Sequence, residues 1–161
     1  GHRVVGLIGL RDLLVSVAKM KTHHWVGATL TLKNLFGTVP GAVYGWPKNV
    51  LHWAGIDRSI IDIWQALTPG FGIIDGVVAM EGDGPLMGDA VQAGVVLMGA
   101  QLPALDATAA RMMGLEPHRM SYLAATARLG GTIAEGRITQ LGDAVTLAPF
   151  ALRPGFEHLR R

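Results

Sequence analysis

The chain has 161 residues, of which half are hydrophobic and 16% are charged. This composition excludes intrinsic disorder and favours a single domain with a well-buried core. The 14 basic and 12 acidic side chains are too evenly balanced to indicate nucleic acid as a partner. There are no cysteines, so the chain has no disulfide, no thiol nucleophile and no cysteine-ligated iron–sulfur cluster of its own. No apolar run reaches the length of a membrane span, and we expect a cytoplasmic protein.

Short apolar runs and helical patterns alternate along the first half of the chain. Residues 13–18 are rich in Leu and Val, which predicts a buried strand, and the polar cluster 19–24 follows directly. Residues 29–36 fit either a helix or a strand, and the glycines and prolines of 37–47 indicate a long irregular loop. Ser59 is a candidate N-cap for a helix that ends before Pro69-Gly70.

The second half continues the alternation. Residues 71–80 predict a second buried strand, and Glu81-Gly82-Asp83-Gly84-Pro85 has the composition of a turn. The remaining predicted elements are a strand at 93–98, helices at 105–113 and 120–129, and a strand or hairpin at 138–147. We therefore expect an α/β domain: a mostly parallel sheet with helices packed on it.

We expect residues 1–161 to form a single α/β domain that is the C-terminal part of a larger one. The chain begins without Met and opens directly into apolar sequence, which indicates a fragment lacking its N-terminal half. A fragment of that kind should expose apolar sheet or helix surface, and it should dimerise or aggregate in isolation.

The two polar clusters are the first place to look for a site. Residues 19–24 and 81–85 each follow an apolar strand pattern. Ligands of open α/β sheets bind beyond the carboxyl ends of the strands, so parallel strands would bring both clusters to one edge. We expect His23, Lys33 and His52 to converge there with the 81–85 turn, lining a concave site.

Several side chains in these segments suit chemistry. Neutral imidazole binds metals or transfers protons, which makes His23 a candidate acid/base; the alternative is a strand end with one His exposed and one hydrogen-bonded. Lys33 lies among apolar residues, where an ammonium is costly without a partner. It could pair with an anion or act as a nucleophile, or its stem could pass along apolar surface to a wet head.

The acidic residues allow structural and functional interpretations. Glu81 and Asp83 in a glycine-rich turn can ligate a hard cation, although their spacing is not that of an EF-hand, and the glycines could serve backbone geometry alone. Asp75 lies in an apolar run and needs a donor if it is buried. Asp106 is placed to be an N-cap.

Most of the chain carries motifs that resemble domain-of-unknown-function family 362. They are Val15-Ser16-Val17-Ala18-Lys19-Met20-Lys21-Thr22-His23, Thr29-Leu30-Thr31-Leu32-Lys33-Asn34-Leu35-Phe36-Gly37, Ile74-Asp75-Gly76, Met80-Glu81-Gly82-Asp83-Gly84-Pro85, Leu105-Asp106-Ala107-Thr108 and Met113-Gly114-Leu115-Glu116-Pro117. Members are often fused to, or encoded beside, ferredoxin-like modules with four-iron–four-sulfur clusters. The resemblance therefore implies a redox setting and, as partners, an iron–sulfur module and the missing N-terminal half of the same protein.

The order His23, Lys33, Pro40-Gly41, His52 is similar to that of nickel-pincer lactate racemases. By that likeness Lys33 would anchor the pincer nucleotide, His52 would ligate nickel and His23 would move the substrate proton. Thr31-Leu32 stands here where those enzymes have a glycine pair before the lysine.

Two hypotheses follow. The first is a metal- or cofactor-dependent oxidoreductase or isomerase, with a divalent metal as the candidate cofactor and any iron–sulfur cluster in a separate domain or partner. Its predicted residues are His23 and Lys33 for catalysis, Lys21, Lys33 and Asn34 for cofactor binding, and His52, Glu81 and Asp83 for a metal. The alternative is a non-catalytic partner or ligand-binding domain that docks an iron–sulfur protein.

Overall fold

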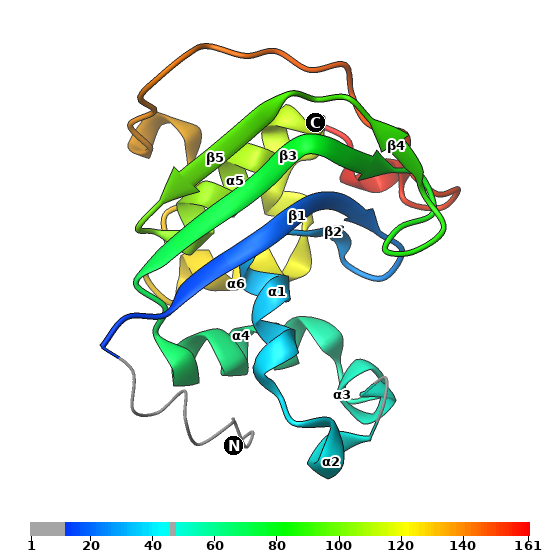
Figure 1. Cartoon of the computed structure of the whole chain (residues 1–161), viewed down its shortest axis with the longest axis vertical. Helices are drawn as coiled ribbons and strands as arrows, with labels where there is room; N and C mark the ends of the chain where they lie inside the picture. The colour runs from blue at the N-terminus through cyan, green and yellow to red at the C-terminus, as the bar shows by residue number, and fades with distance from the viewer. Residues whose placement is uncertain (1–11, 46–47) are drawn as a thin grey trace.

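The computed structural model describes residues 12–45 and 48–161. Five strands form one sheet, and the helices gather on one side of it (Figure 1). The strands are β1 (Val15–His23), β2 (Gly27–Thr29), β3 (Phe71–Glu81), β4 (Asp89–Val91) and β5 (Val95–Gly99). The three strands predicted from apolar runs are β1, β3 and β5 of this sheet, so the α/β class is confirmed.

The centre of the sheet is the parallel pair β1–β3, and every other pair is antiparallel. The predicted parallel arrangement is therefore confirmed for β1 and β3. It is wrong for β5, which runs antiparallel to β3. Residues 82–94, which join β3 to β5, contain no helix, and a parallel connection needs a crossover that is usually helical. The connection from β1 to β3 contains such helices.

Six α-helices lie in the described residues. They are α1 (Thr31–Asn34), α2 (Gly41–Tyr44), α3 (Asn49–Trp53), α4 (Ile56–Leu67), α5 (Leu102–Met112) and α6 (Ser121–Arg128). Short 3-10 turns are η2 (Leu35–Thr38), η3 (Pro117–Arg119), η4 (Glu135–Arg137) and η5 (Glu157–Leu159). The ambiguous segment 29–36 holds the end of β2, α1 and the start of η2. Residues 46–47 of the predicted loop lie outside the described residues.

Three local predictions are wrong. Ser59 is not an N-cap, because α4 begins at Ile56 and the buried Ser59 hydroxyl donates to the Leu51 carbonyl at 3.2 Å. Residues 138–147 form no strand; they are mostly exposed, so no buried face stabilises one. Asp106 lies inside α5 rather than at its start.

Asp106 instead caps a different helix. Its fully buried carboxylate accepts hydrogen bonds from the backbone N–H groups of Thr31 and Leu32, both at 2.9 Å, and from the Thr31 hydroxyl at 2.5 Å. These amides open α1, whose own N-cap residue, Leu30, provides no side-chain cap. Burial raises the pKa of Asp106 to about 7, and the bonds from Thr31 and Leu32 oppose that rise. One carboxylate thus fixes the start of α1 against α5.

The core lies between the helices and one face of the sheet. Met20 and Ile74 point into it and are fully buried. Gly72 faces α5 and α1: a Cβ there would lie 2.8 Å from the Leu105 side chain and 3.0 Å from that of Thr31. The absence of a side chain lets both helices pack closely on β3.

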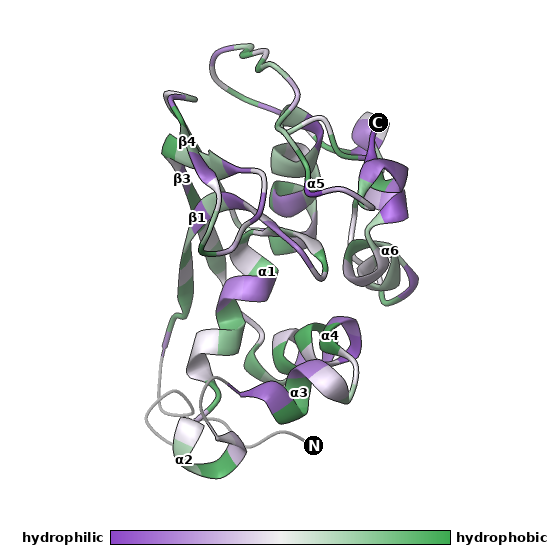
Figure 2. Cartoon of the chain, turned by 90° about the vertical axis from the view of Figure 1, so that its right-hand side faces the viewer, coloured by the Kyte–Doolittle hydropathy of each residue, from purple (hydrophilic) through white to green (hydrophobic). Residues whose placement is uncertain are grey.

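The opposite face of the sheet is covered by no other described element, as Figure 2 shows edge-on. Val17, Ile73 and Met98 form one cross-strand row on it. The exposed fractions of Val17 and Met98 are 60% and 63%, and Val96 on the same face is 52% exposed. The predicted exposure of apolar sheet surface is therefore confirmed, whereas the predicted aggregation or dimerisation stays a prediction.

Candidate functional site: a lysine–histidine cluster

Five basic side chains gather around the carboxyl end of β1. We call them the lysine–histidine cluster: Lys21, His23, Lys33, Lys48 and His52. Two come from β1, one from α1, one from the residue before α3, and one from α3 itself. The cluster forms because the chain leaves β1, turns back through β2 and enters α1 beside the end of the strand.

His23 is the most perturbed member. It is 6% exposed, and its Nδ1 accepts the backbone N–H of Trp25 at 3.1 Å. Burial is the largest cause that lowers its pKa to about 3, followed by repulsion from Lys33, His24, His52 and Lys21. The imidazole is therefore neutral, and because Nδ1 accepts, Nε2 carries the proton.

Lys33 lies beside an aromatic ring. Its Nζ is 4.2 Å from the centre of the Phe36 ring, a cation–π geometry. Burial, followed by repulsion from Lys21 and Lys48, lowers its pKa to about 8. Within residues 12–45 and 48–161, no carboxylate forms an ion pair with Lys33. A mostly buried ammonium without an acidic partner is costly unless an anion neutralises it.

His52 completes the cluster next to Phe36. Its ring makes edge contacts with Phe36 and Trp25, each with 5.2 Å between ring centres. Its Nδ1 lies 3.0 Å from the Lys48 carbonyl, which can only accept, so Nδ1 donates and Nε2 keeps its lone pair. Lys48 has a left-handed backbone conformation, with φ of 68°, and its Nζ donates to the Phe36 carbonyl at 2.9 Å.

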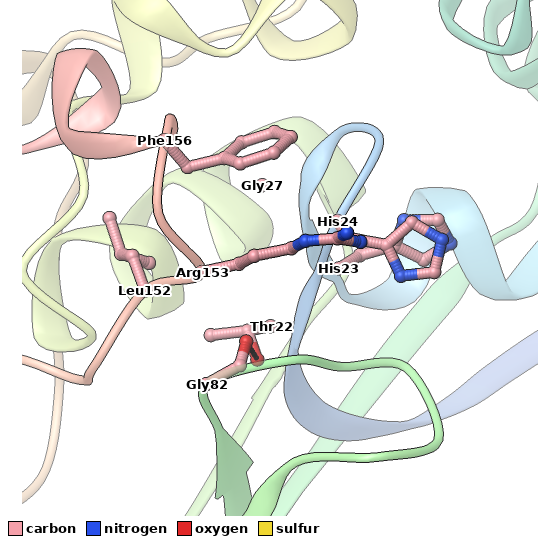
Figure 3. A pocket seen from close by; sticks show the side chains of 8 residues that line it. All are labelled: Thr22, His23, His24, Gly27, Gly82, Leu152, Arg153 and Phe156. Carbon is pink, nitrogen blue, oxygen red and sulfur yellow. Dashed lines mark hydrogen bonds between the residues drawn. The ribbon is translucent and has the colours of Figure 1, made fainter.

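The expected convergence of His23, Lys33 and His52 is confirmed by these contacts. His52 and Lys33 share the Phe36 ring, and both His52 and Lys33 act electrostatically on His23. The prediction that these residues line one concave site is wrong: the shallow pocket at this edge is lined by His23 and His24, and neither Lys33 nor His52 is part of its lining. Figure 3 shows the Arg153 side chain extending from the C-terminal segment toward the two imidazoles.

The 81–85 turn is bonded to the end of β1. The Thr22 hydroxyl donates to the Gly82 carbonyl at 3.0 Å, and the His24 backbone N–H donates to the Gly84 carbonyl at 3.0 Å. The His24 Nδ1 also lies 2.7 Å from that carbonyl. A Cβ on Gly84 would lie 2.1 Å from the Thr22 carbonyl oxygen, so only glycine permits this approach. The turn therefore belongs to the same edge as the cluster.

The carboxylates of this turn face the C-terminal segment. Glu81 accepts the backbone N–H of Ala151 at 2.7 Å, and Asp83 lies 3.4 Å from the Arg153 guanidinium. Among the described residues, no three His, Cys, Asp or Glu side chains are grouped to hold a metal ion. The structure thus does not bring His52 into one ligand group with Glu81 and Asp83.

The other predicted residues have structural partners. Asn34 donates to the Val17 carbonyl at 3.0 Å and to the Ser16 hydroxyl at 3.2 Å, which ties α1 to β1. Lys21 donates to the Pro85 carbonyl at 3.1 Å, and burial lowers its pKa. Asp75 is 44% exposed rather than buried and forms a 2.5 Å ion pair with Lys19.

Sequence reasoning overlooked three contributors to the site. Trp25 and Phe36 supply the rings that connect His52 to the rest of the cluster, and Lys48 supplies a third ammonium. Trp25 directly follows the two histidines and Phe36 lies three residues after Lys33, so a search for aromatic residues near the basic ones would have found both.

The fold is thus an α/β domain with a basic cluster at the carboxyl end of a central strand. Comparison with known protein families shows which family this chain belongs to. The chain matches the model of the family described as Domain of unknown function (DUF362) over residues 4–111, and it belongs to that family.

The chain is also similar to the protein named thylakoid-associated protein sll1697 of Synechocystis sp.. The two are 32% identical over 127 residues, a match that covers 74% of this chain and 38% of the relative. The chain thus spans well under half the length of that relative. No solved structure matches it. Within the part of the chain that the structure describes, no helix is long and apolar enough to cross a membrane.

Proposed function

We propose that the lysine–histidine cluster binds an anionic group of a substrate or cofactor, with Lys33 as its main anchor. The observation that carries this proposal is the mostly buried Lys33 ammonium, which faces other cations and pairs with no carboxylate in the described residues. An anion at this position would remove the repulsion and provide the missing partner. Lys21, at the same edge, adds a second cation for the same group.

His23 is the acid/base residue of this proposal. In the unliganded cluster it is neutral, because burial and the surrounding cations hold its pKa near 3. A bound anion offsets that repulsion and raises the pKa of His23 toward the range in which imidazole transfers protons. Ligand binding would thus activate the group that acts on the ligand. A proton transfer next to a bound carboxylate suits an isomerase or oxidoreductase.

A metal held by a cofactor is compatible with the same residues. His52 keeps the Nε2 lone pair for ligation while its Nδ1–H is fixed by the Lys48 carbonyl, an arrangement typical of ligating histidines. Lys33 would hold the nucleotide of a nickel-pincer cofactor and His52 would ligate its metal; when bound, such a cofactor would supply hydride chemistry. Metal analysis and an absorption spectrum of the purified protein test this part: a metal or chromophore in stoichiometric amount supports it.

Anion binding is tested with inorganic phosphate as the probe. Trp25 contacts His52, so tryptophan fluorescence of the full chain should report occupancy of the cluster. Lys33→Met should weaken phosphate binding by about tenfold or more, the usual value of a charge-assisted hydrogen bond. Lys19→Met is the matched control, because it also removes one positive charge but lies exposed and paired with Asp75. Equal losses in both variants would refute the proposal.

The exposed sheet face favours a second candidate, a docking function. Its apolar row of Val17, Ile73 and Met98 suits the surface of another protein, either an iron–sulfur module or a further part of the same polypeptide. Sedimentation of the full chain with a purified ferredoxin is the test. Binding that Val17→Asp abolishes, while Val50→Asp on α3 leaves it intact, would support docking. The location that we propose for the protein is the cytoplasm.

A further inference from the structure

A second group of polar side chains lies far along the chain from the lysine–histidine cluster. The C-terminal end of α5 and the loop after η4 enclose an open cavity of about 200 Å³. This loop is the long orange segment of Figure 1. The polar residues that line the cavity are Thr108, Arg111, Glu135, Gln140, Thr146 and Arg161.

Arg111 is the lining residue with an unsatisfied hydrogen-bond donor. Its side chain is only 8% exposed. One terminal nitrogen, Nη2, donates to the Ile133 carbonyl, and Nε lies 3.9 Å from the Glu135 carboxylate. The other terminal nitrogen, Nη1, is buried and has no hydrogen-bond partner within the described residues. Buried donors of a charged group are normally satisfied, so this unsatisfied nitrogen points to a missing partner beside the cavity that Arg111 lines.

The charge of the lining has the sign that an anion needs. Glu135 is the single acidic side chain among the lining residues, and two guanidiniums share it: that of Arg111 and that of Arg161, whose Nη2 lies 2.7 Å from it. Glu116, outside the lining, also interacts electrostatically with Arg111. The lining itself keeps one excess positive charge, and its Thr and Gln side chains add neutral donors.

We propose that this cavity binds a small oxyanion, the phosphate or carboxylate group of a metabolite. The Arg111 guanidinium is the buried donor group, Arg161 contributes charge at the rim, and Thr146 and Gln140 complete the contacts from the loop. A guanidinium suits this role because its fixed nitrogens match the spacing of phosphate and carboxylate oxygens. The binding would also hold the irregular loop against α5.

The test is a titration of the full chain with inorganic phosphate and, separately, with acetate, followed by the Nε–H resonance of Arg111 in the NMR spectrum. Saturable shifts with one anion identify the preferred chemistry. Arg111→Met should weaken binding at least tenfold and Arg161→Gln several-fold. Arg128→Gln, the same loss of charge at the exposed end of α6, should leave it unchanged. Because Arg111 also bonds Ile133, Thr146→Val serves as a second variant that keeps this structural contact.

The outcomes separate this site from the lysine–histidine cluster. Lys33→Met should leave the Arg111 shifts intact, and Arg111→Met should leave the fluorescence response at Trp25 intact. If neither anion produces saturable shifts at Arg111, or if Arg161→Gln and Thr146→Val leave them unchanged, the cavity holds only water and the inference is wrong, whatever happens at Lys33.

Discussion

Replacing Lys33 by Met should make the unliganded protein more stable. At pH 7 a protonated Lys33 costs on the order of 3 kcal/mol, because its pKa falls from 10.5 to about 8 and each tenfold change in protonation is about 1.4 kcal/mol. The cation–π contact with Phe36 returns about 1 kcal/mol, and Met keeps the apolar stem. The expected net gain is about 2 kcal/mol, or roughly 4–8 °C in Tm for a domain of this size.

Urea and thermal denaturation followed by circular dichroism, in a buffer free of phosphate, measure this gain. Lys19→Met should change stability by less than about 0.5 kcal/mol, because exposed ion pairs contribute little. The gain from Lys33→Met should shrink as the pH rises from 8 toward 10.5, since native Lys33 is then already neutral. Saturating phosphate should also narrow the gap by stabilising the wild type. A Lys33→Met protein no more stable than wild type would refute the reasoning.

Three further predictions concern other parts of the fold. Because the pKa of His23 is lowered from 6.5 to about 3, its contribution to stability is present above pH 6.5 and is lost as the pH falls toward 3. His23→Gln should flatten the dependence of the free energy of unfolding on pH, as measured by urea titrations. The quantity to compare is the difference in this free energy between wild type and variant at each pH. Asp106, with its pKa raised to about 7, changes stability with pH in the opposite direction in both proteins, so its effect cancels in the difference. Asp106→Ala leaves buried donors at the start of α1 unpaired and should lower the free energy of unfolding by about 3 kcal/mol or more, while an unchanged urea midpoint would contradict the capping role. Gly84→Ala places a Cβ 2.1 Å from the Thr22 carbonyl oxygen and should lower the Tm clearly, whereas Gly136→Ala, with nothing within 4 Å, should be neutral.

The apolar runs alone were enough to place β1, β3 and β5, and helical spacing placed α4, α5 and α6. These signals are local, because burying one face of an element requires a period that the sequence displays. The direction of β5 is not local. It depends on whether the 82–94 connection crosses the sheet, and a short apolar run reads the same in either direction. The predicted strand at 138–147 failed for a related reason, since loose alternation does not reveal whether a neighbouring strand or a core is within reach.

For the candidate site, too, some features follow from the sequence and others only from the tertiary structure. The sequence by itself determined which side chains suit chemistry, because a lysine among apolar residues and histidines at a strand end can be identified without coordinates. Only the tertiary structure decided which of them meet. Phe36 and Trp25 bring His52 to Lys33 and His23, whereas the carboxylates of the 81–85 turn are occupied by the C-terminal segment.

Asp106 shows the physical reason most clearly. From the sequence it is a helix cap, and it is one, but it caps α1, which lies 75 residues earlier in the chain, rather than α5, which contains it. The sequence fixes what a carboxylate can accept. Which amides it meets depends on how two helices pack on β3, and that is set by long-range contacts through Gly72 and the core that no single segment encodes.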